Sequence, residues 1–351
     1  MISFKQNLND MIPILEDAHK KRPIEPRMEK LENLIDIVNS PDFIKYEPYL
    51  VNNILNIVLK RLDDKPKVSD LALKLGNEIM NKISIQVFPL VLQILSNGLS
   101  NDAKWKTKLG TLQILSVYIQ RVFDLDRDLL SASLPNLVNI LTDMIHDTKP
   151  EVSQQAEETC LLALKGITNR DLEPFIEDLL KAIKIREETE ETIQKLAGVV
   201  FVQTVEGSAL SVVVPLMVAG LKTNKAIIKR MCARIVSNMS KLVEEPIEAL
   251  PFLGELIPAL EDSIDTIADP EARNVAEQTL NTLIKMREKG QLMVPQKLFR
   301  NVNEIENEIV KMWENEFDVE QRKYISNIIA SLISTKTLEE IEYQDELNNY
   351  L

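Results

Sequence analysis

The chain has 351 residues, of which 45% are apolar, and a formal net charge of −13 at pH 7. This apolar content excludes an intrinsically disordered chain. Glycine is scarce at 9 residues, and leucine, isoleucine, lysine and glutamate are frequent, a composition that favours helices.

The N-terminal region, residues 1–46, is expected to be a helical cap or arm. Met11, Ile12 and Leu15 form a short amphipathic segment, and a basic run follows at residues 20–22. This stretch lacks the repeat pattern that begins after it.

The sequence carries no mark of secretion or membrane insertion. The N-terminus lacks a basic start followed by an apolar core, and the longest apolar run, residues 209–221, is shorter than the ~18 residues of a membrane span. Cys160 and Cys232 sit in helical patterns without metal-ligand spacing, which favours a reducing compartment. We expect a soluble, cytoplasmic protein with no membrane partner.

A repeat begins at residue 47, marked by prolines that are followed by apolar residues at helical spacing. The prolines recur every 39 to 46 residues, at Pro48, Pro89, Pro135, Pro174, Pro215 and Pro258. We expect each near the start of a helix, where its missing N–H would be unpaired anyway. The third segment puts its apolar residues on one helical face: Leu134, Leu137, Val138, Leu141 and Ile145.

A second series of small residues lies between the prolines, at Ala72, Gly110, Ala156, Ala197, Ala233 and Ala276. Small residues let two helices cross closely, so each unit is interpreted as helix, short turn, helix. An irregular helical bundle would not keep both series in phase over six units. The sequence therefore predicts an all-α fold, a HEAT-repeat α-solenoid of about six helix pairs over residues 47–290.

The repeat pattern stops at Gly290, and the residues from Met293 to Pro295 are expected to break the helix. From Asn301 onward twelve acidic residues face four basic ones, and apolar stripes around Trp313 indicate helices. We expect residues 291–351 to form an acidic helical segment that caps the solenoid.

The stretch from Val214 to Lys241 stands out by charge. Between Leu221 and Val243 it holds six basic residues and no acidic one: Lys222, Lys225, Lys229, Arg230, Arg234 and Lys241. In an acidic chain such a patch indicates an anionic partner.

The members of this patch have different expected roles. Arg230 and Arg273 stand at equivalent places in their repeats, so each is expected to pair with an acidic side chain or a carbonyl of the neighbouring repeat. Lys222, Lys225 and Lys229 share one edge, and no repeat logic accounts for them. Either they form a solvated face or they bind the anionic partner.

A smaller basic cluster, Lys104, Lys106 and Lys108, flanks Trp105. We expect Trp105 to lie in the core with the lysine stems passing over it. The alternative is an exposed tryptophan that stacks on a base while the lysines meet phosphates.

Several segments resemble one known family. They are KLAGVVFVQTVEGSALSVVVPLMVAGL at 195–221, IKR at 228–230, NMSKLVEEP at 238–246, PFLGELIPAL at 251–260, ADPEAR at 268–273 and the Lys-Trp motif at 104–108. The family is the HEAT region of translation elongation factor three, which is shared with the ribosome-associated activator of the amino-acid-starvation kinase. The resemblance implies ribosome association, through ribosomal RNA and proteins. In the elongation factor a helical bundle follows the HEAT region, and residues 291–351 resemble its start.

The sequence departs from the whole elongation factor in one decisive way. It contains no Gly-x-x-x-x-Gly-Lys-Ser/Thr loop for nucleotide phosphates, so the family's ATPase activity is not carried over. Met231 and Ser240 also depart from the family's usual basic residue and cysteine. With only His19 and His146, no metal cluster or histidine-based triad is expected, and we predict no enzyme, no cofactor and no small-molecule substrate.

The preferred hypothesis is a ribosome-binding HEAT module that acts in translation elongation. Its candidate RNA-binding residues are Lys222, Lys225, Lys229, Arg230, Arg234, Lys241, Lys104, Lys106 and Lys108. Three alternatives stay open. The chain is a protein-only HEAT scaffold or adaptor that binds other proteins along its surface, a regulator of the amino-acid-starvation response, or the N-terminal part of a longer ATPase.

Overall fold

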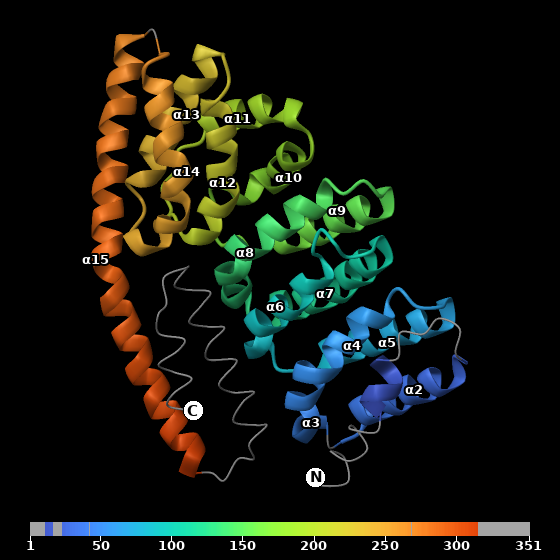
Figure 1. The fold of residues 1–351 in the computed structure, drawn as a ribbon. Coiled ribbons are helices and arrows are strands. Elements are labelled where there is room, and N and C mark those ends of the chain that lie inside the picture. Colours follow the sequence, from blue (N-terminus) through green and yellow to red (C-terminus); the bar gives the residue numbers. More distant parts are fainter. Residues whose placement is uncertain (1–10, 17–22, 42, 268, 315–351) are drawn as a thin grey trace. The chain divides into compact units, whose positions relative to one another are not determined.

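The computed structural model describes residues 11–16, 23–41, 43–267 and 269–314. Every regular element in these ranges is a helix (Figure 1). The described residues divide into two compact units. The first holds 11–126, 147–159 and 309–314, and the second holds 127–146 and 160–308.

The helices follow one another as pairs joined by short turns. In chain order they are α2 (Glu25–Asn39), α3 (Phe43–Tyr49), α4 (Leu55–Arg61), α5 (Pro66–Lys82), α6 (Phe88–Gly98), α7 (Trp105–Leu125), α8 (Arg127–Ile145), α9 (Pro150–Leu164), α10 (Ile176–Lys184), α11 (Thr189–Ala197), α12 (Gly207–Leu221), α13 (Ala226–Ser240), α14 (Pro246–Ile264) and α15 (Pro270–Glu314). A π-helical segment, Leu50–Ile54, joins α3 to α4. From α4 onward this order gives the six predicted helix pairs.

In the first unit, like helices stack on like helices. α4 packs on α6, and α5 packs on both α2 and α7. The side chains of Leu31, Leu34 and Val38 on α2 are fully buried, so α2 occupies the place of a second helix ahead of the first complete pair.

In the second unit, α11 packs on α13, and α12 packs on α13 and α14 (Figure 1). α10 and α11 have only nine residues each, and α12 packs directly on α8. The predicted apolar face of the third segment, from Leu134 to Ile145, is buried here as expected.

The prolines differ from the prediction. Pro89 lies in the first turn of α6 as expected, but Pro135, Pro215 and Pro258 lie inside α8, α12 and α14. These helices begin earlier than the proline pattern indicated, because polar or small residues such as Gly207 and Ser208 already form their first turns. A proline inside a helix costs one backbone hydrogen bond, and burial of the surrounding apolar face offsets that loss.

The predicted break after Gly290 is wrong. α15 continues through Pro295 to Glu314 as one helix. Gly290 is instead a point of close approach, because a Cβ there would lie 2.8 Å from Leu250 Cδ2 and 3.0 Å from the Pro246 carbonyl oxygen. The predicted domain boundaries at 46/47 and 290/291 both fall inside helices and stay predictions.

The small residues behave mostly as predicted. Ala72, Gly110, Ala156, Ala233 and Ala276 are buried, while Ala197, at the end of α11, is half-buried. A Cβ on Gly110 would approach Leu62 Cδ2 to 2.8 Å, so a larger residue here would displace the Leu62 side chain.

No single helix in the described ranges has the length and apolarity to cross a membrane. α5 together with residues 85–98 meets the criteria of length and composition, but the two segments are bent by 115° relative to each other.

Two glycines of the second unit test this packing. A Cβ at Gly220 would lie 2.5 Å from Cys232 Sγ and 2.5 Å from Ile193 Cδ1, whereas a Cβ at Gly254 meets nothing within 4 Å. We expect Gly220→Ala to lower the free energy of unfolding by about 1–3 kcal/mol through overpacking. Gly254→Ala should raise it by about 0.5–1 kcal/mol through reduced backbone entropy of the unfolded chain. Urea denaturation of both variants measures the difference, and an unchanged Gly220→Ala protein would contradict the packing described.

Candidate functional site

Several of the turns inside helix pairs are tied to a neighbouring pair by charged side chains. In the first unit, Asp64 Oδ2 accepts hydrogen bonds from Arg27 Nη1 at 2.7 Å and from Arg61 Nη1 at 2.8 Å. All three side chains are at most 7% exposed. Such a desolvated charge cluster is stable only when its members stay together.

Lys108 takes part in a similar tie. Its ammonium donates to Asp147 Oδ2 at 2.9 Å, and each side chain is 10% exposed. Burial raises the pKa of Asp147, but hydrogen bonds from the Lys108 ammonium and the Lys149 backbone amide outweigh it, so the pKa lies below its ordinary value of 3.8.

Lys229 repeats this arrangement in the second unit. It is the fourth residue of α13, as Lys108 is of α7, and its buried ammonium donates to Thr266 Oγ1 at 2.5 Å. Thr266 lies in the next turn, as Asp147 does in the first unit. Both lysines therefore hold the second helix of one pair to the turn inside the next pair.

Lys104 and Lys225 are also equivalent, since each is the N-cap residue of its helix. Both reach back to the preceding pair. Lys104 Nζ binds Asp63 Oδ2, and Lys225 Nζ binds Glu190 Oε2, each at 2.5 Å. These pairs are partly exposed and stabilise the fold by at most about 1 kcal/mol each.

The prediction that no repeat logic accounts for Lys225 and Lys229 is therefore wrong. The sequence did contain the signal, because K-x-x-x-K begins at both Lys104 and Lys225. The small-residue series obscured this signal because it aligns Gly110 with Ala233. Gly110 is the sixth residue of α7 and Ala233 is the eighth residue of α13, so that alignment shifts the two helix starts by two residues.

Trp105 does not lie in the core, which contradicts the prediction. It is the first residue of α7 and 38% exposed. Lys106 is exposed as well, and its ammonium lies 5.8 Å from the centroid of the indole ring, within the range of a cation–π contact. Placement at the tip of the helix, and not on its buried face, explains the exposure.

The two arginines expected to be structural differ from each other. Arg230 Nη1 lies 3.3 Å from Asp269 Oδ2 in the next turn, as predicted for an acidic partner in the neighbouring repeat. Arg273 donates to the carbonyl oxygen of Ile267 at 2.7 Å, which lies in the turn that leads into its own helix.

What remains accessible is a stripe along the outer side of α13, which we call the α13 stripe. It consists of Lys222, in the turn before the helix, and Arg230, Arg234 and Lys241, all exposed. Arg234 donates to the carbonyl oxygen of Ala197 at 3.0 Å, so its position is fixed although its charge is not neutralised. Since α13 has 15 residues, the stripe spans about 20 Å along the helix.

Acidic residues of neighbouring turns lie close to one end of this stripe. Glu190 binds Lys225 and Asp269 binds Arg230, so the stretch that lacks acids in the sequence gains them in space. The turn end is therefore partly neutralised. Arg234 and Lys241, further along α13, have no carboxylate partner in the described part of the chain.

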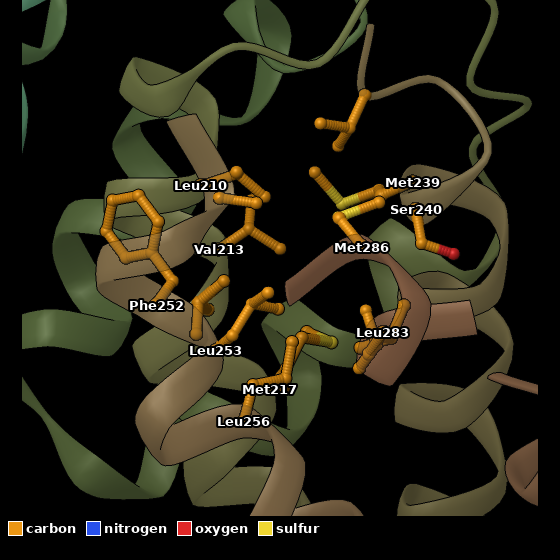
Figure 2. A pocket seen from close by; sticks show the side chains of 14 residues that line it. Leu210, Val213, Met217, Met239, Ser240, Phe252, Leu253, Leu256, Leu283 and Met286 are labelled. Carbon is orange, nitrogen blue, oxygen red and sulfur yellow. The ribbon is translucent and has the colours of Figure 1, made fainter. Parts of the chain in front are cut away.

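A small cavity of the second unit lies between α12, α13, α14 and α15 (Figure 2). Its volume is about 30 Å³, and its lining is apolar, including Met217, Met239 and Met286. An apolar lining of this kind offers a water molecule no hydrogen-bond partners. It is a packing defect of the core and offers no room for a ligand.

Neither cysteine forms a reactive site. Cys160 and Cys232 are buried, and burial raises the pKa of the Cys232 thiol to about 12. His146 lies in the turn after α8 and contacts the carbonyl oxygen of Ile183 at 3.0 Å. His19 lies outside the described residues. The described residues include no group of three His, Cys, Asp or Glu side chains that could hold a metal ion.

Helix pairs with short turns, stacked like on like and tied turn to turn, define a HEAT-repeat α-solenoid. Comparison with known families gives the type of HEAT repeat. The family described as EF3 N-terminal HEAT repeat matches residues 8–160, and the family described as Elongation factor 3/GNC1 HEAT repeat matches residues 186–294. The chain is an elongation factor 3-like HEAT-repeat region.

Individual relatives agree with this assignment. The chain is 33% identical to elongation factor 3 of Pneumocystis carinii over 347 residues, which is 96% of this chain and 32% of that protein. It is 34% identical to elongation factor 3B of Saccharomyces cerevisiae over 245 residues, covering 70% of this chain and 23% of that protein. It is also 35% identical to elongation factor 3 of Phytophthora infestans over 240 residues, covering 68% of this chain and 23% of that protein. The chain thus spans between about a quarter and a third of the length of these relatives.

The Lys108–Asp147 tie makes a pH-dependent prediction. Because the folded-state pKa of Asp147 is lowered, its contribution is fully present above the ordinary pKa of 3.8 and is lost as the pH falls through the folded value. We expect Asp147→Asn to lower the free energy of unfolding by about 1–3 kcal/mol at pH 7, and the difference from the wild type to shrink below pH 3.8.

The control is Asp102→Asn, which changes an exposed carboxylate in the preceding turn and should have little effect at either pH. Urea denaturation at pH values from 7 down to below 3.8 measures both variants. A stability difference for Asp147→Asn that does not depend on pH would show that the carboxylate is not held as an ion.

Proposed function

We propose that this chain is a ribosome-binding module that acts in translation elongation in the cytoplasm. The observation that carries the proposal is the likeness to elongation factor 3 over 96% of the chain. ATP hydrolysis is not included, because the sequence contains no phosphate-binding loop. The proposed partners are ribosomal RNA and ribosomal proteins.

The α13 stripe is the surface that we propose for ribosomal RNA. Its cations lie along a single helix and its two ends, and two of them, Arg234 and Lys241, have no carboxylate partner in the described ranges. Backbone phosphates are bound by rows of such side chains, and their binding releases counterions. Lys106 beside the exposed Trp105 is a second candidate contact, in the first unit.

Four predicted contact residues rank lower because of their partners. Lys108 and Lys229 are buried and bound to polar groups, and Lys104 and Lys225 each form a salt bridge. Engaging RNA through them would require breaking ties between repeats. We therefore assign binding to Lys222, Arg234 and Lys241 and a positioning role to the four lysines. Arg230 ranks between the two groups, because it is exposed but lies 3.3 Å from Asp269 Oδ2.

Co-sedimentation with purified ribosomes at several salt concentrations tests this assignment. We expect the chain to bind, and the combined change Lys222→Gln, Arg234→Gln and Lys241→Gln to weaken binding. It should also flatten the dependence of the logarithm of affinity on the logarithm of salt by about 1 for each phosphate that the variant no longer binds.

The matched control neutralises three exposed cations of α15 in the same unit, through Lys285→Gln, Arg287→Gln and Lys289→Gln. It changes the net charge equally and should leave the salt dependence unchanged. If both triple variants weaken binding equally, the α13 stripe acts only through the net charge of the chain and is not a specific binding surface. Absence of ribosome binding by the wild-type chain would refute the proposed function and favour a protein-only scaffold.

A further inference from the structure

The connector between α11 and α12, residues 198–206, exposes two apolar side chains. Val200 is 80% exposed and Val202 is 68% exposed, and no other large apolar side chain of the described part is more exposed than Val200. Single exposed apolar residues are common on protein surfaces. Here the two valines flank the buried Phe201, so exposed and buried side chains alternate over residues 200–202.

The connector is held firmly in place. Phe201, between the two valines, is buried, and Val205 is almost completely buried. The Asp171 carboxylate, in the preceding connector, accepts hydrogen bonds from the backbone amides of Val202 at 2.7 Å and of Gln203 at 2.9 Å.

Further bonds fix the connector on both sides. Asn169 Nδ2 donates to the Thr204 carbonyl oxygen at 2.9 Å. The Val205 amide donates to the Leu242 carbonyl oxygen, in the following connector, at 3.0 Å. The segment is thus bound to both neighbouring repeats, and the exposure of the valines is imposed by the fold. A surface fixed in this way loses little conformational entropy when it binds.

The charges around the valines indicate the chemistry of the partner. The exposed charged residues of connectors 165–175, 198–206 and 241–245 are three cations and four carboxylates: Lys165, Arg170, Lys241, Glu173, Glu206, Glu244 and Glu245. Because this surface carries one more negative than positive charge, it attracts phosphates less than the part of the α13 stripe around Arg234 does. Apolar contacts surrounded by polar groups of mixed sign are typical of protein–protein interfaces.

We propose that Val200 and Val202 form a rigid apolar knob that docks into a shallow, uncharged apolar pocket of a protein partner. This inference rests on the proposed function, under which the partner is a protein of the ribosome and not its RNA. The knob and the α13 stripe would then divide recognition between the two components of the ribosome.

Ribosome co-sedimentation of Val200→Asp and Val202→Asp tests the knob. Each change places a charge where an apolar side chain should become buried, so we expect each variant to bind about tenfold more weakly. The loss of affinity beyond that of the control should persist at high salt, where repulsion between the added carboxylate and phosphates is screened. The control is Leu125→Asp, which alters a side chain that is 63% exposed elsewhere and should bind as the wild type does. Thermal melts should show all three variants folded.

A photoreactive phenylalanine analogue in place of Val200 identifies the partner directly. A cross-link to a ribosomal protein supports the knob, whereas a cross-link to RNA overturns it. If the wild-type chain binds ribosomes and both valine variants bind equally well, the knob is wrong and the proposed function stands. If the wild-type chain does not bind ribosomes, both the proposed function and the proposed role of the knob are refuted.

Discussion

The ties between consecutive turns are the constraint on which the rest of the structure depends. An amphipathic helix pair buries its apolar face against the next pair, but that face alone does not fix how far one pair slides or rotates on the other. Arg27–Asp64 and Lys108–Asp147 in the first unit, and Lys229–Thr266 in the second, supply the missing register. Each joins the second helix of one pair to the turn inside the next pair. A buried cation that lost its partner would cost about 3–5 kcal/mol, so such groups disfavour other registers more strongly than they stabilise the native one.

This constraint changes how the basic residues are understood. In the sequence, the stretch from Leu221 to Val243 is a single positive patch in an acidic chain. In space, part of it holds repeats together, and carboxylates from Glu190 and Asp269 meet its turn end. Only cations without a described carboxylate partner keep a positive electrostatic potential that would attract an anionic partner. These are above all Arg234 and Lys241. A run of basic residues in a repeat protein therefore overstates the binding surface, because sequence neighbours and spatial neighbours differ.

Much of the fold could be predicted from the sequence, since the periodic features are local. Helix pairing follows from apolar residues such as Leu134 to Ile145 at helical spacing, and the buried Ala72, Ala156, Ala233 and Ala276 follow from their recurrence. Proline positions failed as helix starts because a proline in the first turn and one in a well-buried interior have the same sequence surroundings. Gly290 failed as a terminator because its close contact with Leu250 comes from a residue 40 positions earlier. The candidate site could be predicted only in part: residue type indicated the cations, but burial of Lys108 and Lys229 depends on acceptors in the next turn.

The basic stretch overstates the accessible surface, whereas the connector with Val200 and Val202 exposes more than its sequence indicates. Its sequence, VVFVQTV, has the apolar content of a core strand, and nothing in its composition indicates exposure. The bonds to Asp171, Asn169 and Leu242 hold the connector so that Phe201 and Val205 are buried while Val200 and Val202 face solvent. The same backbone that ties three consecutive repeats together thereby presents two apolar side chains at fixed positions. Register and recognition depend on one set of hydrogen bonds here, so a change at Asp171 would disturb both, while a change at Val200 would disturb recognition alone.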